Sequence, residues 1–133
     1  MVTADAFKDA MGRFATGVTV VTVDTPSGPR GLTVNAFMSL SLDPPLVGVA
    51  IAHRARTYDR LRESDRFGIS ILAEDQEAYS NLFAVAPSEV EPNFETVDGV
   101  PVLSAAVAQV ACRIEARHAV GDHDLFVGLV TDL

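Results

Sequence analysis

The feature that most constrains the fold is a two-residue alternation that runs from Ala108 to Arg117. Apolar side chains repeat at every second position of this stretch, which reads AQVACRIEAR. A period of two places alternate side chains on the same face of an extended strand. The stretch is therefore predicted to be a long strand with one buried face and one face in water.

Shorter strands are predicted wherever β-branched and apolar residues gather between turn signals. The turns are marked by Gly, Pro, Asp and Ser, which favour reversals of the backbone. The predicted strands cover residues 18–23, 33–42, 46–52 and 66–72, and a last strand follows a turn at Gly121 and Asp122. Strand 18–23 is expected to form a hairpin with the stretch that begins at Thr33, because TPSGPR between them has turn composition.

Three helices are predicted from apolar residues at helical spacing. The first has a stripe at i, i+3, i+4 and i+7, made of Phe7, Ala10, Met11 and Phe14. Gly17 follows where a left-handed C-terminal cap fits. The other two cover residues 56–64 and 74–84, and residues 87–101 are predicted to be a loop that covers a site.

Many strands, few helices and no regular strand-helix alternation favour a mainly β fold, a small β-barrel with peripheral helices. A length of 133 residues is typical of one domain, 1–133. No Gly-rich dinucleotide fingerprint is present. The formal net charge of −8 argues against a nucleic-acid partner, and no apolar run approaches the roughly 20 residues that cross a bilayer. The one cysteine, Cys112, is expected to be a buried inert thiol in a cytoplasmic protein.

The stretch from Thr33 to Leu46 carries polar side chains on one predicted face. Thr33, Asn35, Ser39 and Ser41 alternate with apolar residues, with Phe37 as the exception. A solvent-facing strand also shows Ser and Thr, so that interpretation stays open. The absence of Lys, Arg and Glu from residues 33–46 favours a ligand-facing surface instead.

Two clusters of polar residues are further candidate sites. Arg54, Arg56 and Arg60 surround Thr57, and they form either a solvated helix face or a clamp for a phosphate group. The second cluster has no recognised metal-ligand spacing, and no metal is predicted there. It consists of His118, Asp122, His123 and Asp124.

Several stretches together resemble the flavin reductase family with the FMN-binding split barrel, a Greek-key type of barrel. They are FATGVTVVTV, GLTVNAFMSLSLDPPLV, RTYDRL, FGISILAEDQ and GDHDLFVG, and they follow the order of the family. Members serve as reductase components of two-component monooxygenases. The resemblance implies an NAD(P)H-dependent oxidoreductase that passes a hydride from NADH or NADPH to FMN or FAD. It also implies a homodimer with the flavin near the subunit interface, and a monooxygenase component as partner.

The resemblance also implies which residues contact the cofactors. Thr33 and Asn35 match positions near the flavin phosphate and ribityl chain, and Ser39, Ser41 and Leu42 match positions beside the ring, where backbone N–H groups would stabilise negative charge. The implied flavin-binding set is Thr33, Val34, Asn35, Ala36, Ser39, Ser41, Leu42, Ala50, Ile51, Ala52, Arg56, Thr57 and Phe83. Phe83 is expected to close over the flavin. His123 of the Gly-Asp-His turn is implied as the catalytic residue on the nicotinamide side.

Two other functions use the same fold. A non-catalytic split barrel that holds flavin or haem as a carrier or sensor is one, and an FMN enzyme with a substrate other than free flavin is the other. Members of the family normally continue for a few tens of residues past the position of Leu133. We therefore expect either a chain cut short of that C-terminal segment or a barrel completed differently.

Overall fold

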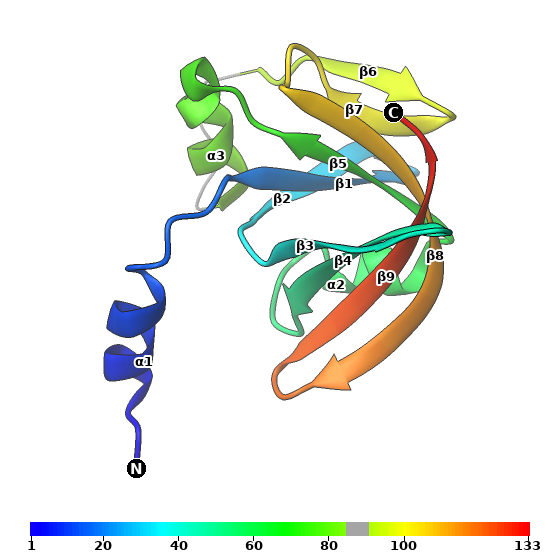
Figure 1. The fold of residues 1–133 in the computed structure, drawn as a ribbon. Coiled ribbons are helices and arrows are strands. Elements are labelled where there is room, and N and C mark those ends of the chain that lie inside the picture. The colour runs from blue at the N-terminus through cyan, green and yellow to red at the C-terminus, as the bar shows by residue number, and fades with distance from the viewer. Residues whose placement is uncertain (85–90) are drawn as a thin grey trace.

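The computed structural model describes residues 1–84 and 91–133, and strands dominate both ranges (Figure 1). The elements in chain order are α1 (Ala4–Met11), β1 (Thr19–Thr25), β2 (Gly28–Val34), β3 (Phe37–Leu42), β4 (Pro45–Ala52), α2 (Tyr58–Glu63), β5 (Arg66–Ile71), a 3-10 helix (Glu74–Gln76), α3 (Glu77–Ala84), β6 (Phe94–Val97), β7 (Val100–Leu103), β8 (Ala108–Val120) and β9 (His123–Asp132). This confirms the mainly β fold with peripheral helices. The strands predicted at 18–23, 46–52, 66–72 and 108–117 all form.

The seven longest strands form one antiparallel sheet in the order β2-β1-β5-β8-β9-β4-β3. β2 and β3 follow each other in the chain, yet they form the two opposite edges of this sheet. Only residues 35 and 36 connect them, so the sheet must curl until its edges meet. The backbone N–H of Ala50 in β4 donates to the carbonyl of Ala36, at 3.0 Å, where the edges approach.

The core lies inside the curled sheet and is made of side chains from its inner face. Phe67, Ile69, Cys112 and Phe126 are fully buried there. Gly128 has to be small, because a Cβ at this position would lie 2.8 Å from the Phe67 ring. Burial raises the pKa of the Cys112 thiol to about 12, so it stays protonated. The prediction that Cys112 is buried is confirmed.

Part of the segment predicted to be a loop, residues 87–101, is a hairpin instead. β6 and β7 pair across a turn at Asp98 and Gly99, whose φ angles are both positive. Asp-Gly is a strong signal for such a turn, and the prediction missed it. β7 is buried against β5, where a Cβ on Gly68 would meet the carbonyl of Pro101 at 2.5 Å. Residues 91–93 form neither helix nor strand, and residues 87–90 of that prediction fall outside the described residues.

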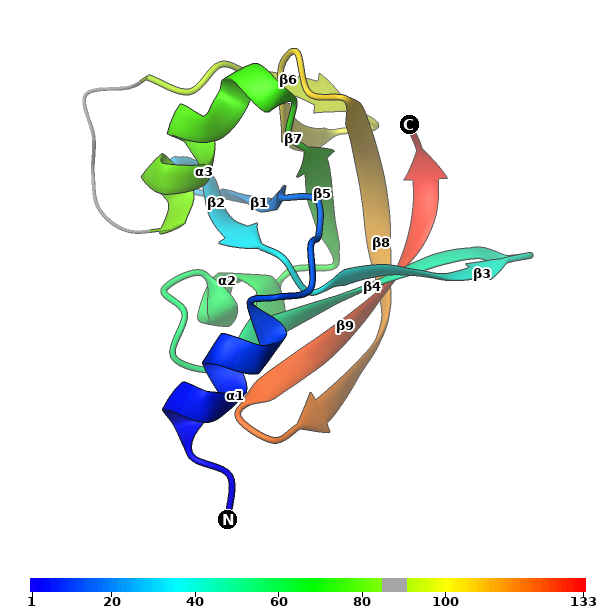
Figure 2. The ribbon, with the colours of Figure 1, turned by 60° about the vertical axis from the view of Figure 1, so that its left-hand side comes forward.

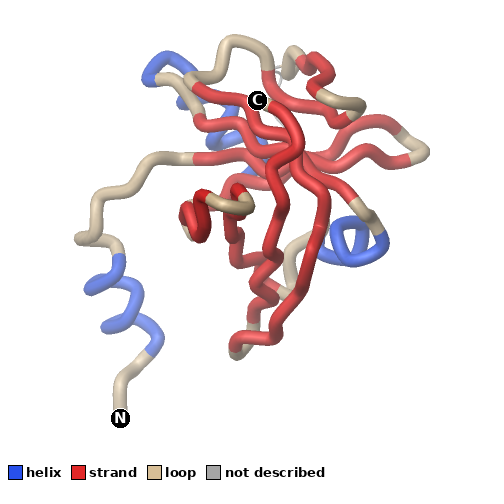
Figure 3. Tube along the Cα trace, turned by 45° about the vertical axis from the view of Figure 1, so that its right-hand side comes forward, coloured by secondary structure: helices blue, strands red, loops and turns tan. Residues whose placement is uncertain are grey.

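Helix α1 forms, but it does not pack on the rest of the chain. It ends at Met11, with Gly12 in a right-handed conformation as its cap, so the predicted cap at Gly17 is wrong. Its apolar residues Phe7 and Met11 are more than half exposed, as is Phe14 beyond its end. Figures 1 and 3 show the helix standing away from the barrel. The apolar stripe thus has no partner within the described residues.

The stretch predicted as one strand from Thr33 to Leu42 is two strands. It breaks at Asn35 and Ala36, which leave the ladder between β2 and β3. Since β2 pairs with β1 and β3 pairs with β4, the two halves belong to opposite edges of the sheet. The predicted continuous polar face therefore does not exist.

Among residues 1–84 and 91–133, no helix has the length and apolarity that a membrane span requires.

Candidate functional site

A groove of about 1070 Å³ lies where the two edges of the sheet meet. Its lining comes from β2, the break at residues 35–36, the end of β4, the turn that follows, helix α3 and the start of β9. The lining residues are Ser27, Pro29, Arg30, Gly31, Leu32, Thr33, Val34, Asn35, Ala36, Ala50, Ile51, Ala52, Arg54, Ala55, Arg56, Thr57, Leu82, Phe83, Ala84 and His123. The structure thus gathers every residue of the implied site except Ser39, Ser41 and Leu42.

Helix α3 is fastened to β2 along one side of the groove. The hydroxyl of Thr33 donates to the carbonyl of Ser80 at 2.7 Å. Gly31 allows a close approach, because a Cβ at that position would lie 3.1 Å from the ring of Phe83. Phe83 also meets Phe94 of β6 edge to face, with ring centroids 6.2 Å apart. The Thr33 proton is therefore used inside the protein, and its hydroxyl can only accept from a ligand.

The break between β2 and β3 presents exposed backbone and small side chains to the groove. Asn35 and Ala36 are both exposed. The carbonyl of Asn35 accepts from the N–H of Phe37 at 2.9 Å, which fixes the bend. The Asn35 amide side chain carries both donors and an acceptor. This is the polar group of the break that a ligand can reach.

The opposite side of the groove comes from β4 and the turn after it. Ile51 and Thr57 are buried, so their side chains belong to the packed interior and their backbone lines the groove. Ala50 and Ala52 alternate with Ile51 and are half-buried. Small side chains on this face leave room for a flat ligand close to the strand. Arg54 and Arg56 are exposed on the turn.

Positive charge is concentrated in this groove although the chain as a whole is acidic. Arg30, Arg54 and Arg56 line it, in a protein with a formal net charge of −8. Guanidinium groups bind phosphate oxygens through paired hydrogen bonds. Of the arginines considered for a phosphate clamp, Arg54 and Arg56 are in the groove, whereas Arg60 lines a different hollow.

His123 stands at the start of β9, beside the end of β4. The strand register pairs it with Ala52. Its Nδ1 is 2.7 Å from a carboxylate oxygen of Asp122. The hydrogen bond with His123 lowers the pKa of Asp122 below its usual value. Asp122 therefore stays ionised and orients the imidazole, whose ring is about two-fifths exposed.

The residues that the structure does not bring to the groove are Ser39, Ser41 and Leu42. They lie on β3, which pairs with β4 in a hairpin that extends from the barrel (Figure 2). Leu42 is 93% exposed. The reason is the strand break, which turns the chain at residues 35–36. Within this chain these three residues are outside the groove, and their position beside a flavin ring stays a prediction.

Some groove residues were missed by the sequence reasoning. Arg30 was assigned to a turn, although extending the hairpin ladder back from Thr33 would have placed it on β2. A cluster around Asp124 was also missed. Its carboxylate accepts from the Tyr58 hydroxyl at 2.6 Å and lies 2.8 Å from Nε2 of His53. These residues are far apart in sequence, so no local pattern indicates the cluster.

The Asp124 cluster has a definite electrostatic character. The hydrogen bond from Tyr58, followed by that from His53, lowers the pKa of Asp124. The hydrogen bond to Asp124 raises the pKa of Tyr58 in return, because the proton bridges the two oxygens. Both directions describe a carboxylate that remains ionised and a phenol that remains protonated at neutral pH.

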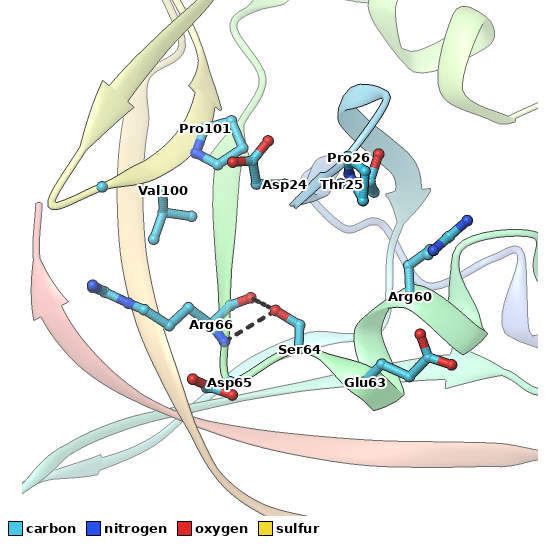
Figure 4. A pocket seen from close by; sticks show the side chains of 11 residues that line it. Asp24, Thr25, Pro26, Arg60, Glu63, Ser64, Asp65, Arg66, Val100 and Pro101 are labelled. Carbon is cyan, nitrogen blue, oxygen red and sulfur yellow. Dashed lines mark hydrogen bonds between the residues drawn. The ribbon is translucent and has the colours of Figure 1, made fainter.

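A second, smaller hollow of about 480 Å³ lies between the β1–β2 turn, the end of α2 and the β6–β7 hairpin (Figure 4). It is lined by charges of both signs, among them Asp24, Arg60, Glu63 and Arg66. Arg66 is already paired with Asp98 at 2.7 Å. None of the residues of the implied site lies in this hollow.

Comparisons with known proteins agree with one another. Residues 11–133 match the family described as "Flavin reductase like domain". An NADH-dependent flavin reductase from a Rhodococcus species is 47% identical over 95% of this chain and 74% of its own length. The reductase component of 4-hydroxyphenylacetate 3-monooxygenase from Thermus thermophilus is 43% identical over 97% of this chain and 83% of its own.

Solved structures give the same result. The flavin reductase PheA2 superimposes with a TM-score of 0.93 at 41% identity, over 98% of this chain and 86% of that chain. The styrene monooxygenase flavin reductase from Pseudomonas putida S12 has a TM-score of 0.88 at 38% identity, over 94% of this chain and 83% of that chain. The chain belongs to the flavin reductase family, and its fold is the split barrel of that family.

Proposed function

We propose that this protein is an NADH-dependent flavin reductase that uses FMN or FAD. The observation that carries the proposal is the groove, which unites four separated segments of the implied site with three arginines. Its volume of about 1070 Å³ lies just above the range of roughly 300 to 1,000 Å³ that is typical of ligand sites. Relatives with this activity include an FMN reductase from Agrobacterium fabrum and an FAD reductase from Streptomyces globisporus.

The groove residues suit the chemical parts of a flavin nucleotide. Arg54 and Arg56, beside the buried Thr57, supply the positive charge that a phosphate needs. The Asn35 amide is available to a polyhydroxyl chain, and the small Ala50 and Ala52 leave a flat surface for a ring. When bound together, the two cofactors supply the redox chemistry, in which a hydride leaves the nicotinamide C4 for the flavin N5.

The protein's own task is to hold two rings in contact and exclude water. Near-attack geometry requires reacting atoms roughly 3 to 3.5 Å apart, so the groove must be rigid. Phe83, packed on Gly31 and Phe94, forms an apolar side of the groove. His123, oriented by Asp122, presents its imidazole at the start of β9. We assign His123 to the nicotinamide side, where it positions the hydride donor.

We also propose that the protein is a homodimer. The β3 hairpin shows Met38, Leu40 and Leu42 to solvent, with exposures of 46%, 43% and 93%. Exposed apolar groups that lie together are typical of interfaces. In a two-fold dimer the hairpin of one protomer would approach the groove of its partner, and Ser39, Ser41 and Leu42 would then reach the ring from across the interface.

Two further assignments belong to this proposal. The product, reduced flavin, is proposed to serve a monooxygenase, since relatives include reductase components of styrene and 4-hydroxyphenylacetate monooxygenases. A cytoplasmic location is proposed as well, because NADH is an intracellular reductant and the buried Cys112 is a free thiol.

An anaerobic assay tests the proposal. The purified chain is mixed with FMN and NADH, and the loss of the flavin's visible absorption is followed at several protein concentrations. We expect a rate proportional to protein and a lower rate with NADPH. Binding of FMN without bleaching by either nicotinamide would overturn the reductase and favour a carrier or sensor. Bleaching of bound FMN only, with no turnover of added flavin, would indicate an FMN enzyme with another substrate.

A further inference from the structure

The groove's arginine-bearing turn is held at both ends by one side chain. Residues 54–57 line the groove, while the residues on either side of them, His53 and Tyr58, do not. Both of these contact Asp124: the Tyr58 hydroxyl at 2.6 Å and Nε2 of His53 at 2.8 Å, each on a different carboxylate oxygen. One carboxylate on β9 thus connects the two ends of the turn.

The place of Asp124 in the sheet explains why a side chain is needed there. The β4–β9 ladder pairs Ile51 with Asp124 and ends where Ala52 pairs with His123. One more backbone bond follows, from the N–H of His53 to the carbonyl of Asp122, at 2.9 Å. Beyond it the chain leaves the sheet. The remaining backbone hydrogen bonds of the turn are local, such as that from the N–H of Tyr58 to the carbonyl of Ala55, at 3.1 Å.

Packing holds Tyr58, at the second end of the turn, in a fixed position. The Tyr58 ring meets the fully buried Phe126 edge to face, with centroids 6.4 Å apart. The centroids of the His53 and Tyr58 rings are 5.1 Å apart, and the guanidinium of Arg62 lies 5.8 Å from the Tyr58 centroid. The Asp124 side chain is only 14% exposed. Tyr58 is therefore an anchored donor rather than a mobile surface phenol.

The geometry points to Asp124 as a positioning residue of the groove: by holding His53 and Tyr58 it fixes the turn that presents Arg54 and Arg56 to an anionic ligand. That Asp124 positions the turn is inferred from its contacts with His53 and Tyr58. That the ligand is a flavin phosphate rests on the proposed function. Asp124 itself does not line the groove, so its effect on binding is transmitted through the turn.

Substitutions separate positioning from general stability. Asp124→Ala removes both contacts, and we expect the Kd for FMN to rise about tenfold, as for the loss of hydrogen bonds to a charged group. Asp124→Asn should restore most of the affinity, because its amide oxygen accepts from Tyr58 and its N–H donates to His53. The matched control is Asp98→Ala, which breaks the Arg66 ion pair at the β6–β7 turn, away from the groove.

The test has two readouts, and the first needs no ligand. Hydrogen exchange by mass spectrometry of the full ligand-free chain should show faster exchange of the amides at residues 54–58 in Asp124→Ala, but not in Asp98→Ala. Unchanged exchange of this segment would overturn the inference. The second readout is fluorescence titration with FMN, combined with steady-state kinetics. We expect KM for FMN to rise while kcat stays within about twofold, because the substitution displaces the exposed Arg54 and Arg56 and leaves the place of the reacting rings unchanged.

The outcomes distinguish the two proposals. A wild-type chain that binds no FMN would overturn the proposed function, while the exchange result would still decide whether Asp124 holds the turn. Faster exchange with an unchanged Kd for FMN would overturn the positioning role. So would an equal rise in Kd for Asp98→Ala, or a failure of Asp124→Asn to recover affinity. A fall in kcat with KM unchanged would contradict it as well.

Discussion

Residues 33–36 and residues 39–42 differ in surroundings although only two residues separate them. The first group lines the groove, and the second lies on the β3 hairpin at the other edge of the sheet. Two residues in irregular backbone, Asn35 and Ala36, make this difference. The comparison teaches that the site depends on where the sheet closes: residues 33–36 line the groove, while residues 39–42 carry exposed apolar side chains on a hairpin outside it.

The largest expected effect concerns the hairpin. In a two-fold interface each substitution occurs twice, so Leu40→Asp with Leu42→Asp would bury several unpaired carboxylates. We expect the dimer dissociation constant to rise by roughly 1000-fold or more, because buried charge without a partner is costly. Sedimentation velocity over a concentration series measures this. Val107→Asp with Val120→Asp, at other exposed apolar positions, is the control. If the variant sediments like the wild type, the hairpin is not part of a dimer interface.

The next effect concerns the groove's positive charge. Arg54→Ala with Arg56→Ala should raise the Kd for FMN by roughly 100-fold, since two charge-assisted contacts are lost. The difference in Kd between variant and wild type should be smaller at high salt, because screening weakens the binding of FMN to the arginines of the wild type. Fluorescence titration at two ionic strengths measures both, and Arg113→Ala, an exposed arginine paired with Glu115 on β8, is the control. A similar loss in the control would mean that only net charge matters.

How far the sequence predicted these regions depends on the range of the interactions involved. β4, β5 and β8 were predicted correctly because alternation and turn residues are local signals. The break at Asn35 was missed, since neither Gly nor Pro marks it; it is enforced by pairing of β2 and β3 with strands at opposite edges. The first helix forms where its apolar spacing predicted it, although its cap is Gly12 rather than Gly17, and no other described residue packs on its apolar stripe.

The candidate site shows the same division. The groove residues implied by resemblance lie together, because each is carried on a strand, turn or helix whose position the family fold determines. Arg30 and the Asp124 cluster were not found from the sequence. His53 and Asp124 are 71 residues apart, so only the β4–β9 register brings them together. Sequence patterns could predict the elements, but not this contact between them.

The third prediction concerns His123. If it positions the nicotinamide, His123→Ala should raise KM for NADH about tenfold, in the range expected for one lost binding contact. The Kd for FMN should change much less. Steady-state kinetics and flavin titration measure the two separately. His118→Ala is the matched control, because His118 is exposed on β8 and does not line the groove. Equal losses for NADH and FMN would contradict the assigned role.

The fourth prediction separates two adjacent groove residues. Asn35→Ala should raise the Kd for FMN about fivefold, as its exposed amide is a direct contact. Thr33→Val should act differently, because its hydroxyl donates to the carbonyl of Ser80 and fastens α3. We expect a lower midpoint of thermal unfolding and a Kd for FMN within about threefold of wild type. The reverse order of the two effects would assign the Thr33 hydroxyl to the ligand.

The smallest effect concerns Ser39 and Ser41, and it tests whether the two regions cooperate across an interface. Ser39→Ala with Ser41→Ala should raise the Kd for FMN only about twofold in the dimer, since neutral contacts of a surface hairpin are weak. When they are combined with Leu40→Asp and Leu42→Asp, which should dissociate the dimer, the serine substitutions should not raise the Kd for FMN any further. Such non-additivity is the sign of one shared interaction. If the serine effect persists in the monomer, the hairpin acts on the groove of its own chain, and the separation between residues 33–36 and 39–42 disappears when flavin binds.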